Sequence, residues 1–165
     1  MLERTGVPTE EDLAKVIPPE ERRKRGPYAV FECFQRIPCD PCYPACKAGA
    51  VKPFDDINDL PVVDLDKCNG CGACVAACPG LAVFVVDETF SETEALVKMP
   101  YEFLPLPEPG ETVGCLDREG REVCSGRVVR TVKGKDKMAT PVVWVAFPKA
   151  SCHSVRHIAL RRGVA

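Results

Sequence analysis

Four closely spaced cysteines constrain this chain more than any other feature. The run CNGCGACVAACP places Cys68, Cys71, Cys74 and Cys78 at the spacing C-x-x-C-x-x-C-x-x-x-C, followed by proline. Three thiolates at such intervals can surround one iron–sulfur cube, and Gly70 and Gly72 permit tight turns that aim backbone N–H groups at its sulfurs. A structural zinc site usually pairs two C-x-x-C units across a longer spacer. We therefore predict that this run binds an iron–sulfur cluster.

A second cysteine group lies upstream. Cys39, Cys42 and Cys46 have the spacing C-x-x-C-x-x-x-C, which matches the last three cysteines of the first run. The position expected for the first ligand is Arg36, which cannot bind iron, but Cys33 lies three residues earlier. Either Cys33 completes a 4Fe–4S site through a longer loop, or three cysteines hold a 3Fe–4S cluster or a cube with an open iron. We favour Cys33 as a ligand because eight cysteines then satisfy two cubes.

The segments around the two groups repeat one another. A predicted strand over residues 28–33 leads into the first group, and short strands are expected at 51–54 and 61–65 before the second. A predicted buried strand at 80–86 follows. CKAGAV after the first group parallels CPGLAV after the second, giving an internal repeat of about 30 residues that favours two related sites.

Residues 28–87 resemble the bacterial-type two-cluster ferredoxins, most closely through VVDLDKCNGCGACVAACPG. The resemblance implies a pseudo-twofold α+β fold and two 4Fe–4S clusters with crossed ligation. It assigns one cluster to Cys33, Cys39, Cys42 and Cys78. It assigns the other to Cys68, Cys71, Cys74 and Cys46. Two departures from the family are the C-x5-C opening of the first group and Lys47, where the family usually has proline.

The flanking regions predict an α+β chain with three parts. Residues 1–27 form a short helical extension, in which Thr9 caps one helix and Pro19 begins another. We interpret its basic run, residues 22–25, as a solvated helix end. Residues 28–90 form the two-cluster domain, and residues 91–165 a small all-β barrel or sandwich. The candidate strands of that last part are Ala95–Phe103, Thr112–Asp117, Glu122–Val132, Val142–Phe147 and Val155–Leu160.

Charge and composition indicate in which kind of cellular compartment the protein works. Residues 26–90 carry four basic and nine acidic side chains, whereas residues 91–165 carry twelve basic and nine acidic. No run of apolar residues is long enough to span a bilayer, and the first residues lack the apolar core of a secretion signal. Eleven cysteines without such a signal favour metal binding in a reducing compartment, and we expect a cytoplasmic protein.

Several residues outside the two groups can bind metals in principle. Cys115, Cys124 and Cys152, with His153 and His157, have a spacing that matches no metal motif. We interpret the first two as core thiols of a hairpin and Cys152 as a loop thiol. Trp144, among Val142, Val143, Val145 and Phe147, is expected in the core.

Cysteine-ligated clusters transfer single electrons, and no residue pattern in this chain predicts a catalytic group. We therefore expect a non-catalytic electron-transfer subunit of a larger oxidoreductase, working beside a flavin-bearing dehydrogenase subunit. Small iron–sulfur subunits of flavin-dependent dehydrogenases resemble such a chain. Two alternatives are a free ferredoxin-type carrier and a cluster-stabilised binding or sensing module. We do not expect a nucleic-acid partner.

Overall fold

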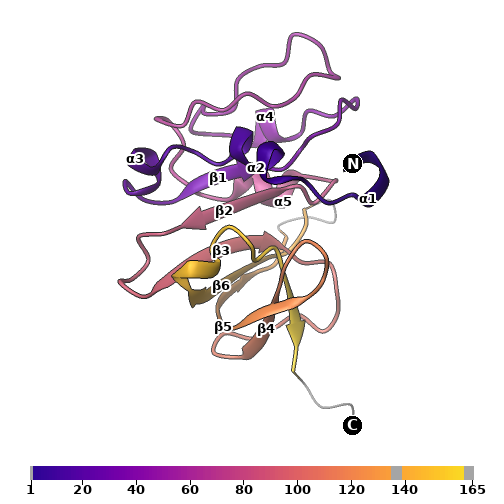
Figure 1. Ribbon diagram of the computed structural model, residues 1–165. Coiled ribbons are helices and arrows are strands. Elements are labelled where there is room, and N and C mark those ends of the chain that lie inside the picture. The colour runs from indigo at the N-terminus through magenta and orange to yellow at the C-terminus, as the bar shows by residue number, and fades with distance from the viewer. Residues whose placement is uncertain (1, 135–138, 162–165) are drawn as a thin grey trace.

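The computed structural model describes residues 2–134 and 139–161 (Figure 1). The helices are α1 (Leu2–Thr5), α2 (Glu10–Val16), α3 (Glu20–Arg23), α4 (Cys42–Ala45), α5 (Ala73–Ala77) and the 3₁₀-helix η1 (Lys149–Ser151). The strands are β1 (Tyr28–Phe31), β2 (Val83–Asp87), β3 (Glu94–Pro100), β4 (Thr112–Leu116), β5 (Glu122–Val132), β6 (Val142–Pro148) and β7 (His157–Leu160). Within the described residues, every helix is too short to cross a membrane.

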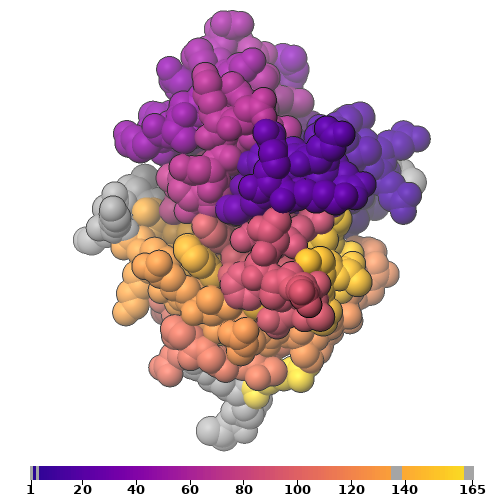
Figure 2. Space-filling model, turned by 90° about the vertical axis from the view of Figure 1, so that its left-hand side faces the viewer, coloured from indigo at the N-terminus to yellow at the C-terminus, as the bar shows by residue number. Residues whose placement is uncertain are grey.

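All seven strands belong to one antiparallel sheet in the order β1-β2-β3-β6-β5-β4-β7. The boundary expected near residue 90 falls in the turn between β2 and β3. These two strands pair with each other, as at Val85 and Lys98. The strands expected as a separate barrel or sandwich thus extend the sheet that begins with β1 and β2. The cysteine loops lie at one end of this sheet, and the C-terminal strands form the other end (Figures 1 and 2).

Both faces of β1 and β2 are buried, which explains their uninterrupted apolar sequences. Successive side chains of a strand point to opposite faces. One face joins the main core, through Tyr28, Val30, Phe84 and Val86. The other face packs against the cysteine loops, through Ala29, Phe31, Val83 and Val85. The two strands therefore form a wall between the core and the cysteine loops.

Local signals predicted helix α2 well, whereas α1 was not predicted and α3 is shorter than expected. Thr9 caps α2 through a capping box, in which the Asp12 N–H donates to Thr9 Oγ1 at 3.3 Å and the Thr9 N–H donates to Asp12 Oδ2 at 3.1 Å. The helix ends at Val16, two residues before Pro18.

The strands expected at 51–54 and 61–65 are reduced to a single bridge between Val51 and Val63. Both segments contain proline, which has no N–H for a sheet ladder.

Candidate iron–sulfur site

A cavity lies between the sheet and the loop that follows residue 67, and four cysteines line it. They are Cys46, Cys68, Cys71 and Cys74. The other lining residues, apart from Asn69, are small or apolar: Ala29, Phe31, Ala48, Ala50, Val51, Val63, Gly70, Gly72, Ala73 and Val85. Four convergent thiols in a cavity with an almost entirely apolar lining match the donor set and the surroundings that a 4Fe–4S cluster requires.

Backbone N–H groups point at the sulfurs of this cavity. The N–H of Ala29, on β1, donates to Cys68 Sγ at 3.4 Å, and the N–H of Ala50 donates to Cys46 Sγ at 3.2 Å. Hydrogen bonds to cysteine sulfur stabilise the thiolate and influence the reduction potential of a bound cluster. The strand β1 therefore contributes to the site although it carries none of these cysteines.

Gly70 and Gly72 make the tight turns of the loop, as the sequence predicts. Their φ angles are 65° and 90°, in the left-handed region that favours glycine. A Cβ atom at Gly70 would also lie 2.5 Å from the Cβ of Pro27. Gly70 is therefore required both by its backbone conformation and by the close approach of the segment before β1.

The internal repeat has a structural counterpart in the turns after Cys46 and Cys78. The third residue after each cysteine is left-handed, with φ of 64° at Gly49 and 54° at Leu81. In both turns the N–H of the next residue then donates to the cysteine sulfur, at 3.2 Å for Cys46 and 3.4 Å for Cys78. The two half-sites therefore share the same backbone turn and the same N–H to sulfur hydrogen bond, and the second half forms this turn without glycine.

The pKa values of the thiols show which cysteines are close to one another. Burial raises the pKa of Cys42 to about 11, and the neighbouring charges of Cys78, Cys39 and Cys33 contribute to the shift. The pKa values of Cys33 and Cys39 are raised in the same way, first by burial and then by Cys78. Three thiols whose ionisation is disfavoured by burial and by neighbouring thiolates need a cation to remain together as thiolates.

The second set of cysteines shows the same effect. Burial raises the pKa of Cys74 to about 12, and the charges of Cys68, Cys71 and Cys46 contribute to the shift. The structure thus brings Cys46 toward the later cysteines and Cys78 toward the earlier ones. Arg36, at the position of the missing first ligand, forms an ion pair with Asp59 at 2.9 Å.

A buried ion cluster supports the residue before Cys33. Arg118 donates two hydrogen bonds to Glu32, at 2.6 and 2.8 Å, and Arg156 donates a third at 2.7 Å. Arg156 is only 6% exposed. These two arginines lie after β4 and before β7, so the C-terminal strands fix the start of the first cysteine group.

Lys98 of β3 performs a related role at the other cysteine group. Its side chain is buried, its Nζ donates to the carbonyl oxygen of Gly70 at 2.6 Å, and it lies 4.1 Å above the Trp144 ring. Burial lowers the pKa of Lys98, while the charge of Cys71 acts against this shift. Trp144, expected in the core, is instead half-buried between Lys98 and Arg130.

Arg22 corrects our interpretation of the basic run at residues 22–25 as a solvated helix end. Arg22 is 7% exposed, and its guanidinium donates to four backbone carbonyls, including those of Leu65 at 2.6 Å and Cys68 at 2.7 Å. The N-terminal extension therefore holds the cysteine loop in place. The sequence patterns did not predict that Arg22 and Lys98 are buried. For Lys98, however, its place within the apolar sequence ALVKMP indicates burial.

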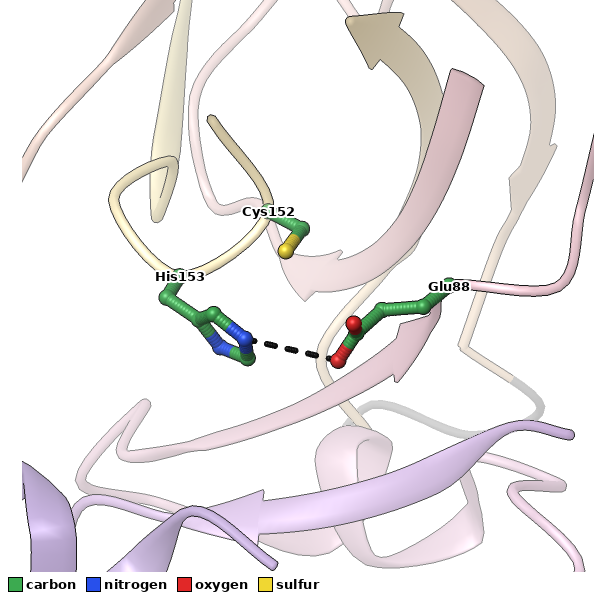
Figure 3. Close-up of side chains that lie close together, drawn as sticks. All are labelled: Glu88, Cys152 and His153. Carbon is green, nitrogen blue, oxygen red and sulfur yellow. Dashed lines mark ion pairs between the residues drawn. The ribbon is translucent and has the colours of Figure 1, made fainter. Parts of the chain in front are cut away.

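A group outside the two cysteine sets also has metal-ligating atoms close together. One ligand atom from each of Glu88, Cys152 and His153 lies within 4.8 Å of the others (Figure 3). However, Arg23 Nη1 lies 2.7 Å from Glu88 Oε2 and 3.3 Å from His153 Nε2, and the Tyr28 hydroxyl donates to Glu88 at 2.6 Å. Because the guanidinium already neutralises the carboxylate, we interpret this group as an ion-pair network.

The remaining candidates are structural. Cys115 and Cys124 are opposite one another on β4 and β5, and Cys115 is fully buried. Both lie on the hairpin as predicted, but only Cys115 is a core residue, because Cys124 is half-buried against the core. His157 stacks against Tyr101 with ring centroids 5.7 Å apart.

Comparisons with known proteins agree with this geometry. Residues 61–84 match the family model of the 4Fe–4S binding domain. The chain is 41% identical over 56 residues to the ferredoxin-type protein NapF of Haemophilus influenzae, covering 33% of this chain and 32% of that protein. It is 40% identical over 74 residues to the polyferredoxin-like subunit of an aliphatic sulfonate oxidoreductase from Pyrococcus furiosus, covering 39% and 40% of the two chains.

A third relative is one of the subunits of the Na⁺-translocating ferredoxin:NAD⁺ oxidoreductase complex of Acetobacterium woodii, 45% identical over 60 residues. That alignment covers 34% of this chain and 16% of the relative. The chain thus spans less than half the length of each of these relatives. No solved structure matches it. The match to the 4Fe–4S binding domain covers residues 61–84, and the similarity to ferredoxin-type sequences covers about a third of the chain.

Proposed function

We propose that this chain is a non-catalytic electron-transfer subunit that holds two 4Fe–4S clusters. The observation that carries the proposal is the apolar cavity whose walls include Cys46, Cys68, Cys71 and Cys74. A 4Fe–4S cluster supplies one-electron chemistry when bound. The chain's own residues exclude water from the cavity, donate hydrogen bonds from backbone N–H groups to the sulfurs, and place charged side chains near the cavity.

We propose Cys33, Cys39, Cys42 and Cys78 as the ligands of a second cluster. Cys78 contributes to the raised thiol pKa values of Cys33, Cys39 and Cys42, and this effect supports the assignment together with the repeated turn after Cys46 and Cys78. The anchoring of Glu32 by two arginines supports the inclusion of Cys33, because it fixes the backbone directly before that residue. With eight thiolates for two cubes, neither cluster lacks a ligand.

The chain is proposed to work inside a hetero-oligomeric oxidoreductase in a reducing, cytoplasmic compartment. The names of two relatives describe them as subunits of oxidoreductases, which supports a subunit role for this chain as well. We propose a flavin-bearing dehydrogenase subunit as the electron donor or acceptor. The C-terminal strands and the N-terminal extension exceed the minimum needed to hold two clusters, and they offer surfaces on which such a subunit can pack.

Anaerobic affinity purification from the native source tests this role. We expect the chain to co-purify in a fixed ratio with at least one larger subunit whose absorption and fluorescence identify bound flavin. Reduction of that subunit by its substrate should bleach the iron–sulfur absorption of this chain. A monodisperse, cluster-containing monomer without partners would contradict the subunit role.

A further inference from the structure

A groove that is open to solvent runs between α5 and the strands β5 and β6. Cys71 and Trp144 line it together with small and apolar side chains. Three cations, Lys47, Arg130 and Lys133, also line it, and each is at least partly exposed. Among the described residues that line the groove, none is acidic.

This cationic lining differs from its surroundings. Residues 26–90, which contribute α5 and the cysteine loops, carry four basic and nine acidic side chains. Two of the three groove cations, Arg130 and Lys133, come from β5 and the residue that follows it. Lys98 adds a fourth positive charge behind the Trp144 ring. The C-terminal strands therefore create a positive surface next to an acidic segment.

The groove also leads directly to a cysteine of the proposed cluster cavity. Of the eleven cysteines, all of which the structure describes, Cys71 alone is exposed. Cys74 is buried, and Cys46 and Cys68 are half-buried. Electron transfer favours the shortest path through protein, so the exposed face of Cys71 is the natural point of entry or exit for this cavity.

We infer that this groove is the docking surface for an acidic face of the redox partner, with electrons crossing beside Cys71. The inference rests on the proposed function and specifies its contact surface. Complementary charge steers association and excludes partners of the wrong sign. Lys47, Arg130 and Lys133 would provide this attraction, and the apolar floor of small residues would permit close approach.

Two small oxidants of opposite charge test the groove without knowledge of the partner. The probes are Fe(III)–EDTA, an anion, and hexaamminecobalt(III), a cation, each of which accepts one electron from the reduced protein. The variant combines Arg130→Glu with Lys133→Glu. A matched control combines Lys15→Glu with Lys24→Glu, which makes the same change in net charge on the N-terminal helices, where both side chains are 72% exposed.

At low ionic strength we expect the groove variant to be oxidised about tenfold more slowly by Fe(III)–EDTA and faster by hexaamminecobalt(III). Both effects should disappear at high salt. The control should change either rate by less than about twofold. Equal effects in the two variants, or no effect in either, would overturn the groove assignment.

The partner itself provides a second measurement. The groove variant, purified from the native source at low salt, should retain its clusters and lose most of the partner subunit, whereas the control should retain both. Iron content measured beforehand separates the two claims. Absence of clusters in the wild type would overturn the proposed function together with this inference, whereas intact clusters with full partner recovery in the groove variant would overturn the inference alone.

Discussion

The ammonium group of Lys98 donates a 2.6 Å hydrogen bond to the carbonyl oxygen of Gly70. Lys98 belongs to β3, and Gly70 lies in the loop between Cys68 and Cys71. A strand beyond the ferredoxin-like segment therefore places a buried positive charge beside the proposed cluster. This contact links the C-terminal half of the chain to the electrochemistry of the site.

Replacement of this lysine should change a reduction potential. Because the reduced cluster carries one more negative charge, the cation of Lys98 stabilises the reduced form. Lys98→Met should lower the midpoint potential of one cluster by about 40 mV, or about 1 kcal/mol for one electron at an effective dielectric constant near 20. An EPR-monitored redox titration measures this change.

Lys149→Met is the matched control, because Lys149 also donates to a backbone carbonyl, that of Ser91, at 2.7 Å. We expect this variant to leave both potentials unchanged. Equal potentials in the Lys98 variant and the wild type would contradict the electrostatic role of Lys98.

Removal of Arg22 should loosen the cysteine loop. Arg22→Ala leaves four backbone carbonyls without their donor, and we expect a loss of about 3 kcal/mol in the free energy of unfolding, with reduced iron content. Arg25→Ala removes only an exposed ion pair with Asp66 and should cost less than about 0.5 kcal/mol. Denaturant unfolding under anaerobic conditions compares the two. Similar losses in both variants would contradict the role of the buried Arg22 contacts.

The ion-pair network around Glu88 predicts a loss of stability in mild acid. Burial lowers the pKa of His153, and only the charge of Glu88 opposes this shift. Its Nδ1 atom is buried and finds no hydrogen-bond partner within the described part of the chain. The unfolded chain therefore binds a proton more readily, so stability should fall as the pH drops below the ordinary histidine pKa of about 6.5.

His153→Gln should flatten this dependence. We expect its thermal midpoint to vary less than that of the wild type between about pH 7 and pH 5, measured in one buffer series at constant salt. At lower pH both proteins should lose stability, because the paired Glu88 has a lowered pKa and its ion pairs are lost on protonation. A wild-type midpoint that does not change over this range would contradict the prediction.

The ligand role of Cys33 has its own test. Cys33→Ala should reduce the iron content from about eight per chain to about seven or four, depending on whether a 3Fe–4S cluster persists at the site. Cys124→Ala, a change at a thiol of the β4–β5 hairpin, should leave the iron content unchanged. An unaltered iron count and EPR spectrum in the Cys33 variant would remove it from the ligand set.

The features that the sequence predicted well depend on residues close together in the chain. The cysteine spacing, the turns at Gly70 and Gly72, the capping box at Thr9 and strand β5 all reflect local conformational preferences. Alternating apolar residues identified the C-terminal strands. They could not show that β3 would pair with β2, since periodicity determines which face is buried but not which strand is adjacent.

The contacts that were missed connect distant parts of the chain. Arg22 meets Cys68 across 46 positions, and Arg118 meets Glu32 across 86. In each contact the cation is at least partly buried, whereas the sequence alone predicts an exposed side chain, because long charged side chains are usually exposed. Only the folded arrangement shows that backbone carbonyls and a buried carboxylate receive them.

Iron and acid-labile sulfide counted in the anaerobically purified protein, with EPR before and after reduction, test the central claim most directly. We predict about eight irons and eight sulfides per chain, little signal as isolated, and interacting signals from two clusters after reduction. About four irons with a single uncoupled signal would contradict the second cluster, and a colourless protein that contains zinc would contradict the iron–sulfur assignment altogether.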